Sequence, residues 1–175
     1  MTVQVWFQDE ARFGQQGTLT RQWALQGTRP RAWRQTQYDY LYVFGAACPQ
    51  TGQTVGLVAP YLNTDTVNAF FDQFQKEVDP DVHVLMIWDQ AGFHSSQKVK
   101  TPENVTLIPL PPYSPQLNPI EKLWQYLRHH HWSNRVYDGY DHLRQAANEA
   151  WQTVCLNPEK IKSICRAQYI ESAFM

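Results

Sequence analysis

Hydrophobic residues recur along this chain at two spacings, and each spacing predicts one kind of element. Alternation over a few residues, or a short apolar run rich in β-branched and aromatic residues, is typical of strands. Such stretches cover residues 3–8, 38–47, 54–59, 82–88 and 105–110. Residues 48–53 have the turn composition of a hairpin. We therefore predict five strands, the second and third of which form a hairpin.

Helical spacing, with hydrophobic residues every three or four positions, appears in three further stretches. The first covers residues 64–78 and follows an Asn–Thr N-cap signal. The second begins at Pro119, with Asn118 as its N-cap and Glu121 at the third helical position. The third covers about residues 140–154. These stretches predict three helices, one before and two after the last two strands.

This order of elements is typical of an α/β domain in which helices flank a mixed central sheet. A chain of 175 residues has the size of one domain, and we find no repeat or second core in it. We therefore expect a single domain over residues 1–175. The pattern leaves the order of the strands within the sheet open.

Composition restricts the class of protein further. Hydrophobic residues make up 43% and charged residues 18% of the chain, as in globular proteins. The three cysteines, Cys48, Cys155 and Cys165, lack the spacing of a disulfide framework or a zinc site. No stretch has transmembrane length. We expect a cytoplasmic protein in a reducing environment, with no membrane partner.

Positive charge is concentrated in one segment, although the net charge is −1. No acidic residue lies between Glu10 and Asp39, and arginines alternate there with Trp23 and Trp33. Such a segment is suited to DNA, because arginines contact phosphates and aromatic rings stack on bases. The candidate DNA contacts are Arg21, Arg29, Arg31 and Arg34. A solvated loop is the alternative interpretation.

Three carboxylates occupy positions where α/β domains build their sites. Asp9 and Asp89 each follow a predicted strand, and Glu121 opens a helix after a proline-rich turn. Sites in open α/β sheets form at the carboxyl ends of strands. Clustered carboxylates repel one another unless a cation neutralises them, and hard oxygen ligands favour Mg²⁺ or Mn²⁺. The three acids therefore predict a divalent metal site for phosphoryl transfer.

Each acid taken alone also has a purely structural interpretation. Asp9 is typical of a turn at a strand end, and Asp89 is typical of a cap on the turn that follows it. An Asn-x-x-Glu helix start resembles a capping box, in which Glu121 serves the helix terminus. Position alone therefore leaves both interpretations open.

Two longer motifs favour the metal site. The stretch WDQAGFHSS around Asp89 and the stretch IPLPPYSPQLNPIEKLW around Glu121 resemble segments of DDE transposases of the mariner-like insertion-sequence superfamily. The opening VWFQDEARFG resembles the first-acid segment of that family. The resemblance runs from Val5 to about Ala150. The 31 residues between the second and third acids are slightly fewer than is common in relatives.

The resemblance implies a ribonuclease H-like fold in which Asp9, Asp89 and Glu121 bind two Mg²⁺ ions, with Mn²⁺ able to substitute. It implies transposon-end and target DNA as substrates. A metal-activated water would cut a phosphodiester, and the freed 3′-hydroxyl would then attack target DNA without a covalent enzyme intermediate. We expect this chemistry to take place in the bacterial nucleoid.

The resemblance also bears on partners. Relatives carry helix-turn-helix DNA-binding segments before the catalytic domain, and this sequence shows none. We expect either a fragment or the second reading frame of a split transposase, partnered by a separately encoded DNA-binding segment. The Trp-x-x-x-Gly-x-Arg-Pro pattern from Trp23 to Pro30 resembles a segment that pairs subunits and holds DNA in relatives. We therefore expect a homodimer on DNA.

Further DNA contacts are expected near the second and third acids. His94 matches the histidine of the family's second-acid segment, and Lys122 and Arg128 lie on the predicted helix of Glu121. Trp124 has core spacing on that helix, and we assign it to packing.

Two features near the acids have structural interpretations. Glu10 would point to the strand face opposite Asp9. The tract His129, His130 and His131 lies near a helix C-terminus, where histidine is electrostatically favoured, and we do not assign it a metal.

Two other functions share parts of this pattern. A ribonuclease H-like nuclease of the resolvase or RNA-cleaving type would have the three acids but no strand transfer. A catalytically degenerate remnant would only dimerise or bind DNA. The PPYSPQLNPIE motif favours the transposase over the first, and the intact acids favour an enzyme over the second.

Overall fold

A computed structural model of the chain describes residues 2–89, 98–167 and 169. Within these residues, five strands form one sheet in the order β3-β2-β1-β4-β5. The strands are β1 (Thr2–Gly14), β2 (Tyr40–Ala47), β3 (Thr54–Ala59), β4 (Val82–Trp88) and β5 (Val105–Pro109). β1, β4 and β5 are parallel, while β2 and β3 run antiparallel to their neighbours. The predicted mixed sheet and the β2–β3 hairpin are confirmed.

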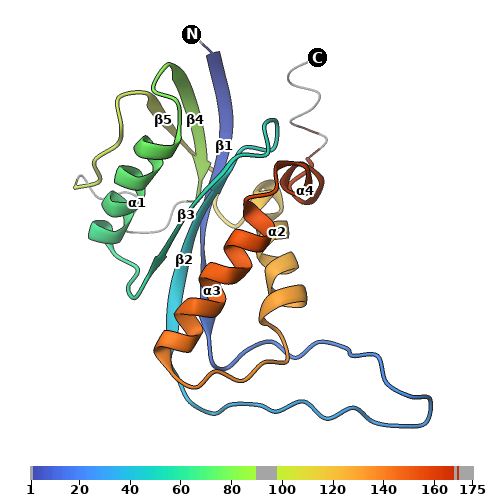
Figure 1. Cartoon of the computed structure of the whole chain (residues 1–175). Coiled ribbons are helices and arrows are strands. Elements are labelled where there is room, and N and C mark those ends of the chain that lie inside the picture. The colour runs from blue at the N-terminus through green and yellow to red at the C-terminus, as the bar shows by residue number, and fades with distance from the viewer. Residues whose placement is uncertain (1, 90–97, 168, 170–175) are drawn as a thin grey trace.

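Helices cover both faces of the sheet (Figure 1). α1 (Thr64–Glu77) packs on one face, and α2 (Ile120–Leu127), α3 (Tyr140–Cys155) and α4 (Pro158–Ile164) lie on the other. Each face has its own core: α1 packs on Trp6, and α2 and α3 pack on Phe7. The alternation of side chains along β1 therefore supplies both layers.

The first strand is longer than the sequence predicts. β1 pairs with β4 only as far as Phe7, opposite Ile87, and continues to Gly14 as the antiparallel partner of β2. The prediction that the strand ends at Asp9 is therefore wrong. Asp9 lies within β1, two residues beyond the last residue that pairs with β4. Pairing with β2 extends the strand, and the alternating pattern of β1 does not reveal that partner.

The helices differ from the prediction mainly at their ends. Asn63 caps α1 in a capping box with Thr66, as its sequence indicates. α2 begins one residue late, at Ile120 with Pro119 as its N-cap, and is followed by a π-helical turn over Arg128–Trp132. α4 was not predicted, although its start repeats the Asn–Pro signal of α2.

The connection between β1 and β2, residues 15–39, extends away from the body of the molecule (Figure 1). We call it the β1–β2 loop. Both of its arms are attached at their bases to the segment after the π-helical turn: Gln15 and Gln35 each donate to the Tyr137 carbonyl, at 3.1 and 2.7 Å. Asn134 holds Thr20 through its side chain. The loop therefore leaves the body from a fixed base.

None of the helices in the described residues has both the length and the apolar character needed to cross a membrane.

Candidate active site

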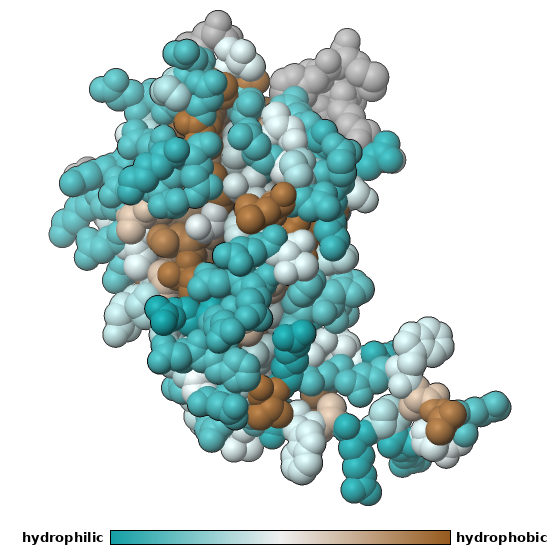
Figure 2. All heavy atoms as spheres, viewed as in Figure 1, coloured by the Kyte–Doolittle hydropathy of each residue, from teal (hydrophilic) through white to brown (hydrophobic). Residues whose placement is uncertain are grey.

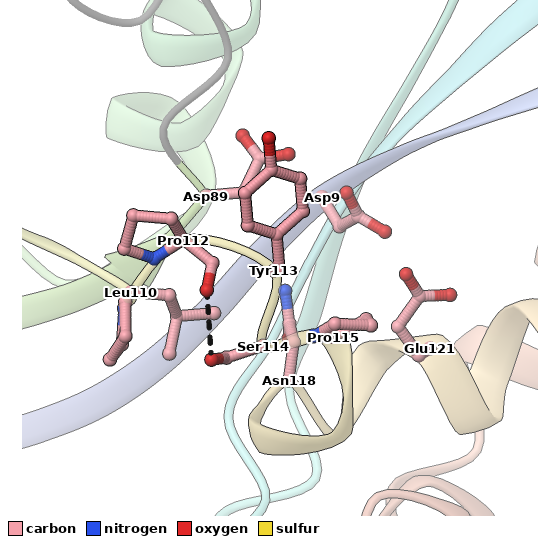
Figure 3. A pocket seen from close by; sticks show the side chains of 10 residues that line it. Asp9, Asp89, Leu110, Pro112, Tyr113, Ser114, Pro115, Asn118 and Glu121 are labelled. Carbon is pink, nitrogen blue, oxygen red and sulfur yellow. Dashed lines mark hydrogen bonds between the residues drawn. The ribbon is translucent and has the colours of Figure 1, made fainter.

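A cavity of about 440 Å³ lies at the carboxyl ends of β4 and β5 (Figure 3). It is lined by Asp9, Asp89, Asn118, Glu121 and the segment 110–115. The three acids come from three elements: β1, the residue after β4, and the first turn of α2. The tertiary structure thus brings the predicted triad to one cavity.

Asp9 is held in place by the sheet and by α2. It lies opposite Gly45 of β2 and shares a strand face with Phe7 and Ala11, toward α2. The indole Nε1 of Trp124 donates to Asp9 Oδ2 at 2.8 Å. This bond links the first acid to the helix that carries the third.

Glu121 is positioned by the buried Asn118. The Asn118 side chain donates to the Gln8 carbonyl of β1 at 3.1 Å and accepts from the Ile120 amide at 3.3 Å. The backbone N–H of Asn118 donates to the Pro115 carbonyl at 2.9 Å. That N–H is therefore not engaged in the capping box that the sequence suggests, and the Glu121 side chain faces the cavity instead (Figure 3).

Asp89 is placed by the end of β4. The Leu110 amide donates to the Trp88 carbonyl at 2.7 Å, which joins the strand end to the segment that closes the cavity. Asp89 itself is exposed, in contrast to the half-buried Asp9.

The electrostatics of the cavity are those of crowded acids. Burial, together with the negative charges of Glu121 and Glu10, raises the pKa of Asp9 to about 7, against the lowering effects of the hydrogen bonds from the Trp124 side chain and the Glu10 backbone. An ionised Asp9 is therefore costly unless positive charge enters the cavity.

The donor set fits a hard divalent cation. Carboxylate oxygens are the ligands that Mg²⁺ and Mn²⁺ prefer, and a cation would relieve the repulsion between Asp9 and Glu121. In the part of the chain that the structure describes, no three His, Cys, Asp or Glu side chains form a ready-made cluster around one ion. The acids share a cavity rather than a closed cage.

Tyr113 stands at this cavity with an unusual backbone. Its φ is 56°, in the left-handed region that disfavours residues other than glycine, and its side chain is fully exposed. Strained residues of this kind cluster at functional sites. An aromatic ring is thus presented to solvent beside the carboxylates (Figure 3).

The predicted DNA contacts that the structure describes lie outside the cavity lining. Lys122 donates to the Arg166 carbonyl and lines a neighbouring cavity of about 580 Å³. Arg128 lies in the π-helical turn. The four arginines are exposed on the β1–β2 loop, namely Arg21, Arg29, Arg31 and Arg34. His94 falls outside the described residues.

Glu10 and the histidine tract make contacts within the chain. Gln8 donates to Glu10 at 2.8 Å, which places Glu10 on the face opposite Asp9. His129 bonds the Gln125 carbonyl at 2.7 Å, and His130 packs on Tyr126 with ring centroids 4.3 Å apart.

Sequence reasoning missed the roles of Trp124 and Asn118. Trp124 is buried, as predicted, but it also binds the first acid. Asn118 was predicted as the N-cap of α2, a position that Pro119 takes, and its side chain ties the start of that helix to β1. Their place in the NPIEKLW motif beside Glu121 was the available signal. Neither hydrogen bond follows from helical spacing, because both partners lie more than 100 positions away in the chain.

Comparison with known proteins identifies the family of this fold and site. Residues 4–144 match the DDE superfamily endonuclease family, so the chain belongs to that family. It is 42% identical over 125 residues to the uncharacterized protein y4pE/y4sA of Sinorhizobium fredii (strain NBRC 101917 / NGR234), covering 71% of this chain and 93% of that protein.

Solved structures of the Mos1 transposase share the fold. The Mos1 strand transfer complex aligns with a TM-score of 0.67 at 14% identity, over 93% of this chain and 50% of that one. The mariner Mos1 paired-end complex with Mg gives 0.69 at 13% identity, over 93% and 51%. The complex with Mn gives 0.63 at 15% identity, over 94% and 56%. The predicted ribonuclease H-like fold is confirmed, and this chain spans about half the length of these Mos1 chains.

Proposed function

We propose that this chain is a transposase catalytic domain that cuts DNA at transposon ends and joins the freed 3′-hydroxyl to target DNA. One observation carries the proposal: Asp9, Asp89 and Glu121, from three separate elements, line one cavity. Membership of the DDE endonuclease family supports the nuclease chemistry. The fold shared with the Mos1 transposase fits this chemistry, and the PPYSPQLNPIE motif favours a transposase over another nuclease of the same fold.

In this proposal the three carboxylates hold two divalent cations, Mg²⁺ with Mn²⁺ able to replace it. Such cations, when bound, activate the attacking oxygen and stabilise the leaving oxygen of a phosphodiester. Asp9 gives up its proton as positive charge enters the cavity, since its pKa is about 7 without it. The hydrogen bonds of Asn118 and Trp124 hold α2 in a fixed position relative to β1 at the site.

DNA would reach the cavity along exposed side chains. Tyr113 offers a ring for stacking on a base beside the acids. Lys122 and Arg128 of the α2 region, with His94, would contact phosphates near the site, and the arginines of the β1–β2 loop would contact DNA further away. The free, buried cysteines suit action on the nucleoid in a reducing cytoplasm.

A second copy of the chain would complete the complex on DNA. The β1–β2 loop exposes large hydrophobic residues that nothing in one copy covers among the described residues (Figure 2). They are Leu19, Trp23, Leu25, Trp33 and Tyr38. Because exposed apolar surface favours association, we propose a homodimer formed through this loop. Recognition of transposon ends would come from a separate N-terminal DNA-binding segment, which leaves residues 1–175 as the catalytic domain.

The test is Mn²⁺-dependent nicking of supercoiled plasmid by the wild type, Asp89→Asn and Glu121→Gln. Each substitution removes one ligand charge, so we expect a loss of about 100-fold or more, beyond the effect of changing groups that only support a ligand. Glu103→Gln is the matched control, because Glu103 is an exposed carboxylate outside the cavity. Nicking that survives in both triad variants would contradict the proposal.

Strand transfer separates the transposase from its alternatives. With pre-cleaved 3′-hydroxyl ends supplied, a transposase joins them to a target plasmid, and a resolvase-type nuclease only cuts. A wild type that stays inactive even with an N-terminal DNA-binding segment supplied would instead indicate a degenerate DNA-binding or dimerising remnant.

A further inference from the structure

Trp124 is joined to the candidate metal site by a contact that packing alone does not require. It lies one turn after Glu121 on α2, is almost fully buried, and donates its indole N–H to Asp9 Oδ2 at 2.8 Å. An indole N–H is a donor only, so Oδ2 serves as its acceptor, and the Glu10 backbone also donates to this carboxylate.

A second buried tryptophan, Trp132, has a different environment from Trp124. Trp132 is also buried and stacks on Phe13 with centroids 4.5 Å apart, yet its Nε1 has no hydrogen-bond partner in the described structure. Trp132 is therefore a comparison for Trp124: a buried indole whose N–H does not contact a carboxylate.

The sheet is shaped to let Trp124 reach Asp9. Gly45 lies directly opposite Asp9 in the β1–β2 pairing. A Cβ atom at Gly45 would lie 2.6 Å from Cη2 of Trp124, closer than real contacts allow, so the indole occupies the space that a side chain would fill. Gly56, the β3 partner of Gly45, makes the same kind of room for Trp151, 2.3 Å from its Cε2.

We propose that Trp124 is a positioning residue for the cation site: its indole N–H fixes the Asp9 carboxylate, and Gly45 supplies the space. This inference rests on the proposed function, in which Asp9 binds a divalent cation. A ligand held in one orientation binds an ion better than one that must be ordered on binding. Trp124 therefore acts through Asp9 rather than on the substrate.

The experiment measures Mn²⁺ binding to the whole chain by isothermal titration calorimetry. Trp124→Phe keeps a ring in the core and removes the N–H, and we expect it to weaken Mn²⁺ binding about 10–100-fold. Trp132→Phe, the matched control, removes an indole N–H that bonds nothing and should stay within about two-fold of the wild type. Circular dichroism establishes that each variant is folded.

A second pair of variants tests the same contact without changing a tryptophan. A Cβ atom at Gly45 would lie 2.6 Å from Trp124 Cη2 and 2.9 Å from Trp151 Cη2, whereas the three nearest atoms to a Cβ at Gly56 all belong to Trp151. Gly45→Ala therefore displaces Trp124 as well as Trp151, and Gly56→Ala controls for the displacement of Trp151. We expect weaker Mn²⁺ binding in Gly45→Ala than in Gly56→Ala, and equal affinities would overturn the role of Gly45.

The outcomes separate this inference from the proposed function. Loss of binding in Asp9→Asn together with wild-type affinity in Trp124→Phe would overturn the role of Trp124 and leave the metal site standing. Wild-type affinity in Asp9→Asn would overturn the metal site itself, and the inference with it.

Discussion

At the scale of single residues, the Asp9 carboxyl group lies in an environment that disfavours its ionised form. It is half-buried and near Glu121 and Glu10, and its pKa is about 7 as a result. Trp124 offsets part of this cost with one hydrogen bond. A group with this environment favours its protonated form in the folded chain, so ionising it costs stability.

The pH dependence of stability follows from this shift. The pKa of Asp9 is raised from 3.8 to about 7, so its unfavourable ionisation is absent below pH 3.8 and is fully felt above pH 7. Without metal, we expect Asp9→Asn to be more stable than the wild type by about 2–4 kcal/mol at pH 8 and nearly equal at pH 4. Urea denaturation at the two pH values measures the difference.

The asparagine is a clean substitution because its amide oxygen can still accept from Trp124. Added Mg²⁺ should reduce the difference in the free energy of unfolding between Asp9→Asn and the wild type at pH 8, because the cation stabilises only the carboxylate. A gap of equal size at pH 4 and pH 8 would show that Asp9 does not ionise as described.

At the scale of elements, α2 holds the site together. It carries Glu121 and Trp124 one turn apart, and Asn118 joins its start to β1 beside Asp9. The relative position of the first and third acids therefore depends on how α2 is attached to the sheet.

Asn118→Ala tests this attachment. It leaves the buried Gln8 carbonyl and the Ile120 amide without their partner, and we expect a loss of about 1–3 kcal/mol in the free energy of unfolding. The variant also lacks the hydrogen bond that holds the start of α2, and with it Glu121, against β1. We therefore expect Mn²⁺ binding to weaken as well. Chemical denaturation and calorimetry measure the two effects.

The α4 helix provides the matched control. Asn157 caps it before Pro158, and its side chain accepts from the Lys160 amide at 3.1 Å, far from the acids in the chain. Asn157→Ala should cost about 1 kcal/mol, like an ordinary N-cap, and leave Mn²⁺ binding unchanged. Weakened Mn²⁺ binding in this variant would indicate a general loss of structure instead.

At the scale of the whole molecule, one copy of the chain leaves large hydrophobic side chains of the β1–β2 loop exposed. Its base is anchored through Gln15, Gln35 and Asn134, while Trp23 and Trp33 are 104% and 85% exposed. An anchored base and exposed tryptophans are what the proposed contact with a second copy of the chain requires.

Trp23→Ser with Trp33→Ser tests the proposed dimer. Because both rings are in solvent, we expect the melting temperature to stay within about 2 °C of the wild type. The mass of the complex on a short DNA duplex should fall from two copies to one, as measured by analytical ultracentrifugation. Dimers that persist in the double variant would place the subunit contact elsewhere.

Much of the fold could be predicted from the sequence, because local patterns report local structure. The strand 82–88, the hairpin and the first helix follow from alternation, turn residues and capping, which act over a few positions. The extra length of β1 could not be predicted from the sequence, because it depends on pairing with β2, which follows the β1–β2 loop in the chain. Helix α4 was missed although a local signal for it, the Asn157–Pro158 start, is present in the sequence.

The sequence by itself determined which acids and motifs this protein carries, and hence its family and the residues proposed for its site. Only the tertiary structure decided how they meet: Asp9 within a long strand, Trp124 bonded to it over Gly45, and Asn118 bridging to β1. The physical reason is range. Periodicity and caps arise between near neighbours, whereas the contacts of the site join segments more than 100 positions apart, and only packing brings those together.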